Sequence, residues 1–304
     1  MEQKNVIECR HLVQTYGTNE ILKGLSFKAQ PFEITFLAGK NGAGKTTFFR
    51  IATGLQKPTS GSVTFAGKSS GEIRDQLAVV FDHAPFYPSL NGYSNIKILS
   101  GIHKVDKEWQ SFVFHTLHLN DTLLKQKTKK LSFGQRHRLA VAIALLRKPN
   151  FLLLDEPSIG LDPSSWQAVK NSLHHCTKLG AAIIITGQNF SDVEGFANRM
   201  VVINDGTAVF SGSPRELIKR QPHTVVIKSQ ETKKITALYP QAVRDDSGQW
   251  IEIACATLEE AETVIHRIQS SRIRFREIFI RKASLEQAFQ TMMHHRTLPN
   301  RKIG

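Results

Sequence analysis

Short continuous apolar runs recur along the first two thirds of the chain, and stretches with helical spacing separate them. A run of four or five apolar residues is typical of a parallel strand that is covered on both faces. Strands that alternate with helices in this way indicate an α/β fold with a mainly parallel sheet. The predicted buried strands are residues 34–38, 151–154, 181–185 and 200–203.

Other segments alternate between apolar and polar residues, as half-exposed strands do. Residues 6–10 and 25–28 have this pattern, and residues 62–65 and 78–81 are further predicted strands. From about residue 83 to 130 the apolar spacing becomes helical instead. The pattern therefore predicts two kinds of strand and one helical block in the same part of the chain.

Beyond residue 221 the composition becomes plainer, and strands and helices alternate again. Capping boxes, in which a hydroxyl residue precedes a Glu by three positions, start helices at Ser213 and Thr257. Ser284 caps a last helix. These signals predict a small α+β segment at the end of the chain. Its predicted strands are residues 225–227, 250–253 and 273–280.

The chain has 304 residues, 40 % of them apolar, and a formal net charge of +14. This length is ample for a full core and suggests two domains. So large a positive charge raises nucleic acid or anionic lipid as a partner. The Lys and Arg residues are scattered, and their densest clusters are residues 125–130 and 272–276. We therefore favour a solvated face that attracts small phosphate-bearing ligands and acidic headgroups over specific nucleic-acid binding.

The sequence predicts neither a membrane span nor a disulfide bond. The longest apolar run, residues 139–146, falls far short of the roughly 18 residues of a membrane span. The N-terminus leads straight into a strand without a signal peptide, so we expect a cytosolic protein that reaches a membrane through a partner. Cys9, Cys176 and Cys255 are far apart, which fits reduced thiols and excludes a zinc site of clustered cysteines.

Residues 39–46 fit the G-x-x-x-x-G-K-[ST] pattern of a phosphate-binding loop between a predicted strand and a predicted helix. Glycines let the backbone wrap closely, so that successive N–H groups point at phosphate oxygens. Lys45 would neutralise the β- and γ-phosphates of ATP, and Thr46 would ligate Mg²⁺ at the helix N-terminus. The candidate nucleotide-binding residues of the loop are Gly39, Asn41, Gly42, Gly44, Lys45, Thr46 and Thr47.

Two further motifs follow in order. Residues 131–136 read Leu-Ser-Phe-Gly-Gln-Arg, and residues 151–162 form a hydrophobic strand that ends in Asp-Glu and continues into Pro-Ser-Ile-Gly-Leu-Asp. With the phosphate-binding loop, these motifs resemble the ATP-binding-cassette (ABC) ATPases over roughly residues 4–220. The resemblance implies a P-loop NTPase fold with a mixed-sheet core, an antiparallel edge sheet and a helical subdomain at about residues 83–145.

The resemblance also assigns roles to residues. ABC ATPases bind two ATP molecules between two subunits that lie head to tail. Asp155 would hold Mg²⁺ through water, and Glu156 would act as the general base that polarises the attacking water. A buried carboxylate pair also needs a cation to offset its repulsion. Ser132, Gly134 and Gln135 would reach the γ-phosphate from the opposite subunit.

Three positions depart from the family pattern. Asp82 replaces the Q-loop glutamine, where it can still ligate Mg²⁺ and serve catalysis, although it is shorter than the Glu of some lantibiotic transporters. Gln188 replaces the switch histidine, so it can donate a hydrogen bond to the γ-phosphate but carries no positive charge. Phe133 replaces a glycine and adds bulk beside the phosphate-facing backbone. Tyr16 falls where the family stacks an aromatic ring on adenine, with packing as the alternative use.

Residues 222–304 resemble the small C-terminal domain of the ATPases that serve ABC-2-type exporters; an unrelated packing domain is the alternative. We therefore divide the chain into an ATP-binding domain, residues 1–221, and an accessory domain, residues 222–304. The predicted function is the ATP-hydrolysing subunit of an exporter, which dimerises and drives transmembrane permease subunits from the inner face of the cell membrane. Because Glu156 is intact, we expect slow hydrolysis. The alternative is a catalytically weakened ATP-binding partner with a structural or regulatory role.

Overall fold

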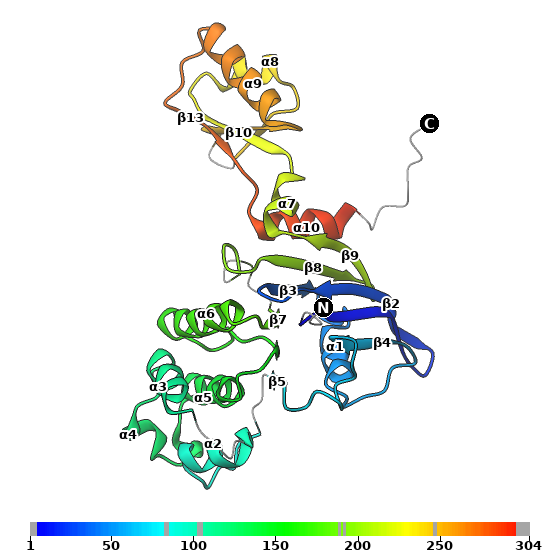
Figure 1. The fold of residues 1–304 in the computed structure, drawn as a ribbon. Helices are drawn as coiled ribbons and strands as arrows, with labels where there is room; N and C mark the ends of the chain where they lie inside the picture. The colour runs from blue at the N-terminus through cyan, green and yellow to red at the C-terminus, as the bar shows by residue number, and fades with distance from the viewer. Residues whose placement is uncertain are drawn as a thin grey trace. The chain divides into compact units, whose positions relative to one another are not determined.

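The computed structural model of the protein describes residues 5–81, 85–101, 106–187, 190, 193–245 and 248–295. Within it the chain divides into two units, residues 1–213 and residues 214–304 (Figure 1). The division at residue 221 that we expect from the sequence stays a prediction.

The predicted buried strands meet in a six-stranded sheet with the order β5-β6-β7-β3-β8-β9. All neighbouring strands run parallel except β9, which pairs antiparallel with β8 at one edge. The middle strands are buried along nearly their whole length, which is the environment that continuous apolar runs require. The strands are β3 (Ile34–Gly39), β5 (Leu77–Val80), β6 (Phe151–Leu154), β7 (Ala182–Thr186), β8 (Arg199–Asn204) and β9 (Thr207–Gly212).

A second sheet of three antiparallel strands has the order β2-β1-β4. It consists of β1 (Ile7–Tyr16), β2 (Asn19–Ala29) and β4 (Ser60–Phe65). Helix α1 (Lys45–Ala52) shares one apolar core with both sheets, and the Phe27 and Phe48 ring centroids lie 5.1 Å apart in it. Figure 1 shows α1 beside β2 and β4. The core therefore holds the start of α1 firmly against the end of β3.

The helical block lies between β5 and β6 in the sequence. Trp109 connects two of its helices, because the indole Nε1–H donates to the Leu145 carbonyl over 2.8 Å. A further helix follows β6. The elements are α2 (Gly92–Ser100), α3 (Lys107–Thr116), α4 (Asp121–Leu124), the 3₁₀ turn η1 (Thr128–Lys130), α5 (Phe133–Leu146) and α6 (Pro163–Lys178).

The second unit contains a four-stranded antiparallel sheet with the order β11-β12-β10-β13. Helices α8 and α9 pack on one face of it over a core of aliphatic side chains. The last helix, α10, packs against α7. The elements are α7 (Pro214–Lys219), β10 (His223–Lys228), α8 (Thr232–Leu238), β11 (Val243–Arg244), β12 (Trp250–Cys255), α9 (Leu258–Ser270), β13 (Glu277–Arg281) and α10 (Leu285–His295).

The alternation of residues 273–280 predicts a longer last strand than the structure has, since β13 spans only Glu277–Arg281. Arg274 is held by the loop before α8: its N–H donates to the Glu231 carboxylate over 2.9 Å, and its carbonyl accepts from the Ser229 hydroxyl. The predicted fold class is otherwise confirmed, with a mixed core sheet, an antiparallel sheet, a helical block and a terminal α+β unit. Among the described residues, no helix is long and apolar enough to span a bilayer.

Candidate nucleotide site

The loop between β3 and α1 has a backbone that only glycine tolerates at several positions. Gly42 and Gly44 have positive φ angles of 81° and 103°. A Cβ atom on Gly44 would lie 2.4 Å from Leu22 Cδ2, and one on Gly39 would lie 2.8 Å from the Ile203 carbonyl oxygen. The glycine pattern of the sequence therefore has a direct steric cause, and it keeps the loop close to β2 and β8.

Lys45 lies folded onto this loop and is only 7 % exposed. Its Nζ donates to the carbonyl oxygens of Gly39 and Lys40 at 2.7 and 3.2 Å. Burial lowers the pKa of the amine, while the carboxylates of Glu156 and Asp155 act in the opposite direction. A cation and two carboxylates therefore meet at the end of β3 and β6.

The carboxylate pair follows β6, and Thr186 at the end of β7 connects its two members. The Thr186 hydroxyl donates to Asp155 Oδ1 over 2.6 Å and accepts from the Glu156 N–H over 2.9 Å. Asp155 is buried, and its N–H donates to the Val80 carbonyl over 2.8 Å. Glu156 has a positive φ of 50°, a strained conformation for a side chain with a Cβ. Thr186 was not predicted from the sequence, in which it is only the polar end of an apolar run.

A cavity of about 500 Å³ brings the predicted residues together. This volume lies in the range of pockets that hold small ligands, roughly 300 to 1,000 Å³. Of the predicted residues, Gly39 and the buried Asp155 do not line it, whereas Ile21 and Arg50 are lining residues that the sequence did not single out. The lining residues are Tyr16, Ile21, Asn41, Gly42, Gly44, Lys45, Thr46, Thr47, Arg50 and Glu156.

Tyr16 lies at the rim of the cavity and is 45 % exposed. Its hydroxyl donates to Gln56 Oε1 over 2.7 Å, which fixes one end of the ring while leaving much of the side chain accessible. The exposure favours a ring available for stacking over a ring used only in packing. Asp82 and Gln188, the other two predicted catalytic residues, lie outside the described residues.

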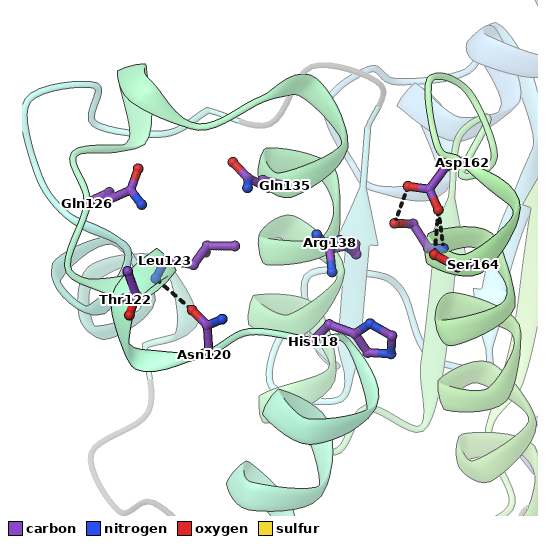
Figure 2. Close-up of a pocket in the computed structure, with 10 residues that line it drawn as sticks. His118, Asn120, Thr122, Leu123, Gln126, Gln135, Arg138, Asp162 and Ser164 are labelled. Carbon is purple, nitrogen blue, oxygen red and sulfur yellow. Dashed lines mark hydrogen bonds between the residues drawn. The ribbon is translucent and has the colours of Figure 1, made fainter.

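The signature residues start helix α5 and do not line this cavity. The Ser132 hydroxyl accepts from the Gln135 N–H, and the Gln135 side chain accepts from the Ser132 N–H over 2.9 Å, which is a complete capping box. Gln135 instead faces a second, polar cavity of about 520 Å³ beside Arg138 and Asp162 (Figure 2). Within one chain, therefore, the signature residues and the phosphate-binding loop do not line the same cavity.

The ring of Phe133 lies on the segment that follows Glu156. A Cβ atom on Gly160 would come within 2.5 Å of Phe133 Cδ1, so the ring rests directly on that glycine. The ring also lies nearly parallel to His137, with centroids 6.2 Å apart. Phe133 remains 38 % exposed. Its bulk is thus partly accommodated within the chain, because Gly160 has no side chain at the point of contact.

Known proteins resemble this chain along most of its length. YhcH, an uncharacterized ABC transporter ATP-binding protein of Bacillus subtilis, is 28 % identical over 95 % of this chain and 96 % of its own length. SrtF, a lantibiotic transport ATP-binding protein of Streptococcus pyogenes, is 30 % identical over 67 % of this chain and 89 % of SrtF. SkfE, the SkfA peptide export ATP-binding protein of Bacillus subtilis, is 33 % identical over 66 % of this chain and 86 % of SkfE.

Solved structures and a family model agree with these relatives. The structure of an ATP-binding subunit of an ABC transporter superposes with a TM-score of 0.65 at 21 % identity, covering 70 % of this chain and 91 % of that one. The family model described as ABC transporter matches residues 22–159, which include the phosphate-binding loop, the signature and the carboxylate pair. The chain therefore belongs to the ATP-binding proteins of ABC transporters, which are ATPases coupled to transport.

Proposed function

We propose that this chain is the ATP-hydrolysing subunit of an ABC-2-type exporter and works at the inner face of the cell membrane on permease subunits. The similarity to SrtF and SkfE, which are named for lantibiotic transport and peptide export, supports export of a peptide-like compound. The similarity to YhcH, which extends over 95 % of the chain, supports a shared role for residues 222–304 as an accessory domain.

The observation that carries the proposal is the cavity that Lys45, Thr46 and Glu156 line together, with the buried Asp155 next to Glu156 in the chain. Lys45 is already desolvated and needs only to exchange its two carbonyl partners for phosphate oxygens. Glu156 faces the same space, so its carboxylate can accept a proton from a water that attacks the γ-phosphate. The exposed ring of Tyr16 lies at the rim, where it can stack on the adenine.

The residues present fit Mg²⁺, which prefers hard oxygen ligands. Thr46 lines the cavity, and the buried Asp155 carboxylate is oriented by Thr186. When bound, the ion would neutralise charge on the β- and γ-phosphates. Asp82 is a further candidate ligand from the sequence. Thr186 would hold the Asp155 carboxylate in one orientation and, through the Glu156 N–H, keep the base beside it.

The separation of the signature from the cavity supports a two-chain site. Ser132, Gly134 and Gln135 lie at the start of α5, and none of them lines the cavity of their own chain. We infer that a second subunit supplies these residues, so that two chains close on two ATP molecules. Closure on ATP and opening after hydrolysis would then move the permease subunits between two states.

Steady-state phosphate release from the purified chain with ATP and Mg²⁺ tests this function. We expect slow but measurable turnover in the native chain and only background release from Glu156→Gln, because the amide cannot accept the proton. Glu156→Gln should still bind ATP in a nucleotide titration. Exporter-type permease subunits should also copurify with the chain from detergent-solubilised membranes.

The second candidate is an ATP-binding partner with a structural or regulatory role. The observation that favours it is Phe133, an exposed aromatic ring at the start of the signature helix, where it can hinder closure of a dimer. The departures from the family sequence at Asp82 and Gln188 favour the same candidate. If the native chain and Glu156→Gln both released phosphate only at the background rate while still binding ATP, this second candidate would be the better account.

A further inference from the structure

Tyr16, the ring at the rim of the candidate nucleotide cavity, lies at the tip of a hairpin. It is the last residue of β1, directly before the turn at residues 17–18 that leads to β2. Hairpin tips belong to the more mobile parts of a fold. Because Tyr16 is 45 % exposed, packing covers only part of its side chain. The orientation of the ring therefore needs a further support.

The segment that follows α1 supplies this support through hydrogen bonds. The Tyr16 hydroxyl donates to Gln56 Oε1 over 2.7 Å. Two further bonds join the same segment to β1, because the Thr15 N–H donates to the Thr59 hydroxyl and the Thr59 N–H donates to the Val13 carbonyl, each over 3.0 Å. The backbone of β1 is thus held by Thr59, and the Tyr16 side chain is held by Gln56.

Gln56 is itself anchored to helix α1. Its N–H donates to the Arg50 carbonyl over 3.1 Å, and the residue is half-buried. The same helix begins at Lys45, which lines the cavity and would bind the phosphates. A helix of this length is a rigid spacer of about 12 Å. Through Gln56, one helix therefore fixes the Tyr16 ring relative to the phosphate-binding loop.

We propose that Gln56 is a positioning residue for nucleotide binding, which holds the Tyr16 ring in place before the adenine stacks on it. This inference rests on the proposed function, in which Tyr16 contacts the base of ATP. A side chain that is already ordered loses less conformational freedom on binding, so the affinity is higher. Gln56 is not among the residues that line the cavity, and it therefore acts through Tyr16 and not on the nucleotide itself.

Variants that remove the hydrogen bond from either side test this role in a titration with AMP-PNP, a non-hydrolysable ATP analogue. Gln56→Leu removes the acceptor, and Tyr16→Phe removes the donor while keeping the ring. Each should raise the dissociation constant about two- to tenfold, because the ring must then be ordered on binding. The double variant should bind as weakly as each single variant, since both changes remove the same bond. Gln56→Glu keeps an acceptor at the same distance from the backbone and should restore the native affinity.

Inorganic tripolyphosphate separates a positioning role from a general structural role, because it has the phosphate chain of ATP but no base. Its dissociation constant, measured by calorimetry, should be the same for the native chain and for Gln56→Leu. Gln167→Leu is the matched control, since Gln167 also forms a side-chain hydrogen bond at the surface, from its Nε2 to Asn171 Oδ1 over 2.9 Å within α6. It should leave the affinities for AMP-PNP and for tripolyphosphate unchanged.

The outcomes separate this inference from the proposed function. Native AMP-PNP affinity in Gln56→Leu, or additive losses in the double variant, would overturn the role of Gln56. An equal loss of affinity for tripolyphosphate would also overturn it, because the variant would then have disturbed the phosphate-binding loop. None of these results affects the phosphate release that depends on Glu156, which tests the proposed function. Conversely, nucleotide binding that depends on Gln56 in a chain that releases no phosphate would uphold this inference and contradict the proposed function.

Discussion

At the scale of residues, the candidate site depends on single groups, such as one hydroxyl group or the absence of a Cβ atom on one glycine. Thr186 is the clearest case, because one hydroxyl donates to Asp155 and accepts from the Glu156 N–H. Hydrogen bonds to an ionised group stabilise more than neutral ones, and a buried carboxylate that loses a donor is left with its desolvation cost. The site therefore depends on a residue that never touches the phosphates in the proposed mechanism.

Replacing this hydroxyl by a methyl group tests its importance. Thr186→Val keeps the shape of the side chain and removes both hydrogen bonds, so phosphate release should fall about ten- to a hundredfold, from the loss of roughly 1.5–3 kcal/mol. Thr177→Val is the control, because the Thr177 hydroxyl is buried but donates only to the His174 carbonyl within α6. Equal phosphate release from both variants would contradict the role of Thr186.

A single methyl group on the loop should abolish nucleotide binding. Gly44→Ala combines a φ of 103° with a Cβ that would lie 2.4 Å from Leu22 Cδ2, and Leu22 is fully buried and cannot move aside. Gly101→Ala has a φ of 62° and no atom within 4 Å of the new Cβ, so it reports backbone strain alone. Both variants should lower the melting temperature by a few degrees, for about 1 kcal/mol of strain. A fluorescent ATP analogue should bind to Gly101→Ala and not to Gly44→Ala.

At the scale of elements, the sequence predicted what local patterns determine. Apolar runs predicted β3, which leads into the loop, and β6, which ends at the carboxylate pair. The capping residues predicted the starts of α9 and α10, where Thr257 and Ser284 accept from backbone N–H groups. The link from Thr186 to the carboxylate pair was not predictable, because it joins the ends of strands 31 residues apart in the sequence. The contact of Phe133 with Gly160 depends in the same way on tertiary packing.

The helical block offers a test of how one hydrogen bond joins two helices. Trp109→Phe removes the bond from the indole N–H to the Leu145 carbonyl and should destabilise the first unit by about 1 kcal/mol more than Trp166→Phe does. Trp166 is the matched control, since its buried Nε1 has no hydrogen-bond partner among the described residues. Thermal unfolding measures the difference. A Trp166→Phe variant that melts at or below the temperature of Trp109→Phe would contradict the role of this bond.

At the scale of the whole molecule, the predicted site residues fall into two groups. The loop, Tyr16 and Glu156 line one cavity, whereas Ser132 and Gln135 form a helix start that faces elsewhere. The resemblance to ABC ATPases predicted this separation, because it places Ser132, Gly134 and Gln135 on the opposite subunit. Periodicity alone could not have predicted it, since it carries no information on which surfaces face one another. We therefore propose that a second chain completes the site.

A dimer trapped by ATP tests this requirement. Glu156→Gln keeps the shape of the side chain but cannot accept a proton, so ATP should persist and sedimentation should detect a dimer with ATP and a monomer without it. Adding Ser132→Arg should restore the monomer, because it removes the cap of α5 and places bulk and charge where the partner's phosphates would lie.

Asn120→Arg is the control, since Asn120 also caps a helix but lies outside the signature, and its dimer should persist. If Glu156→Gln with Asn120→Arg were also monomeric, loss of a cap alone would explain the result. If Glu156→Gln with Ser132→Arg stayed dimeric, the signature would not contact the nucleotide of a second chain, and the two-chain site would be wrong.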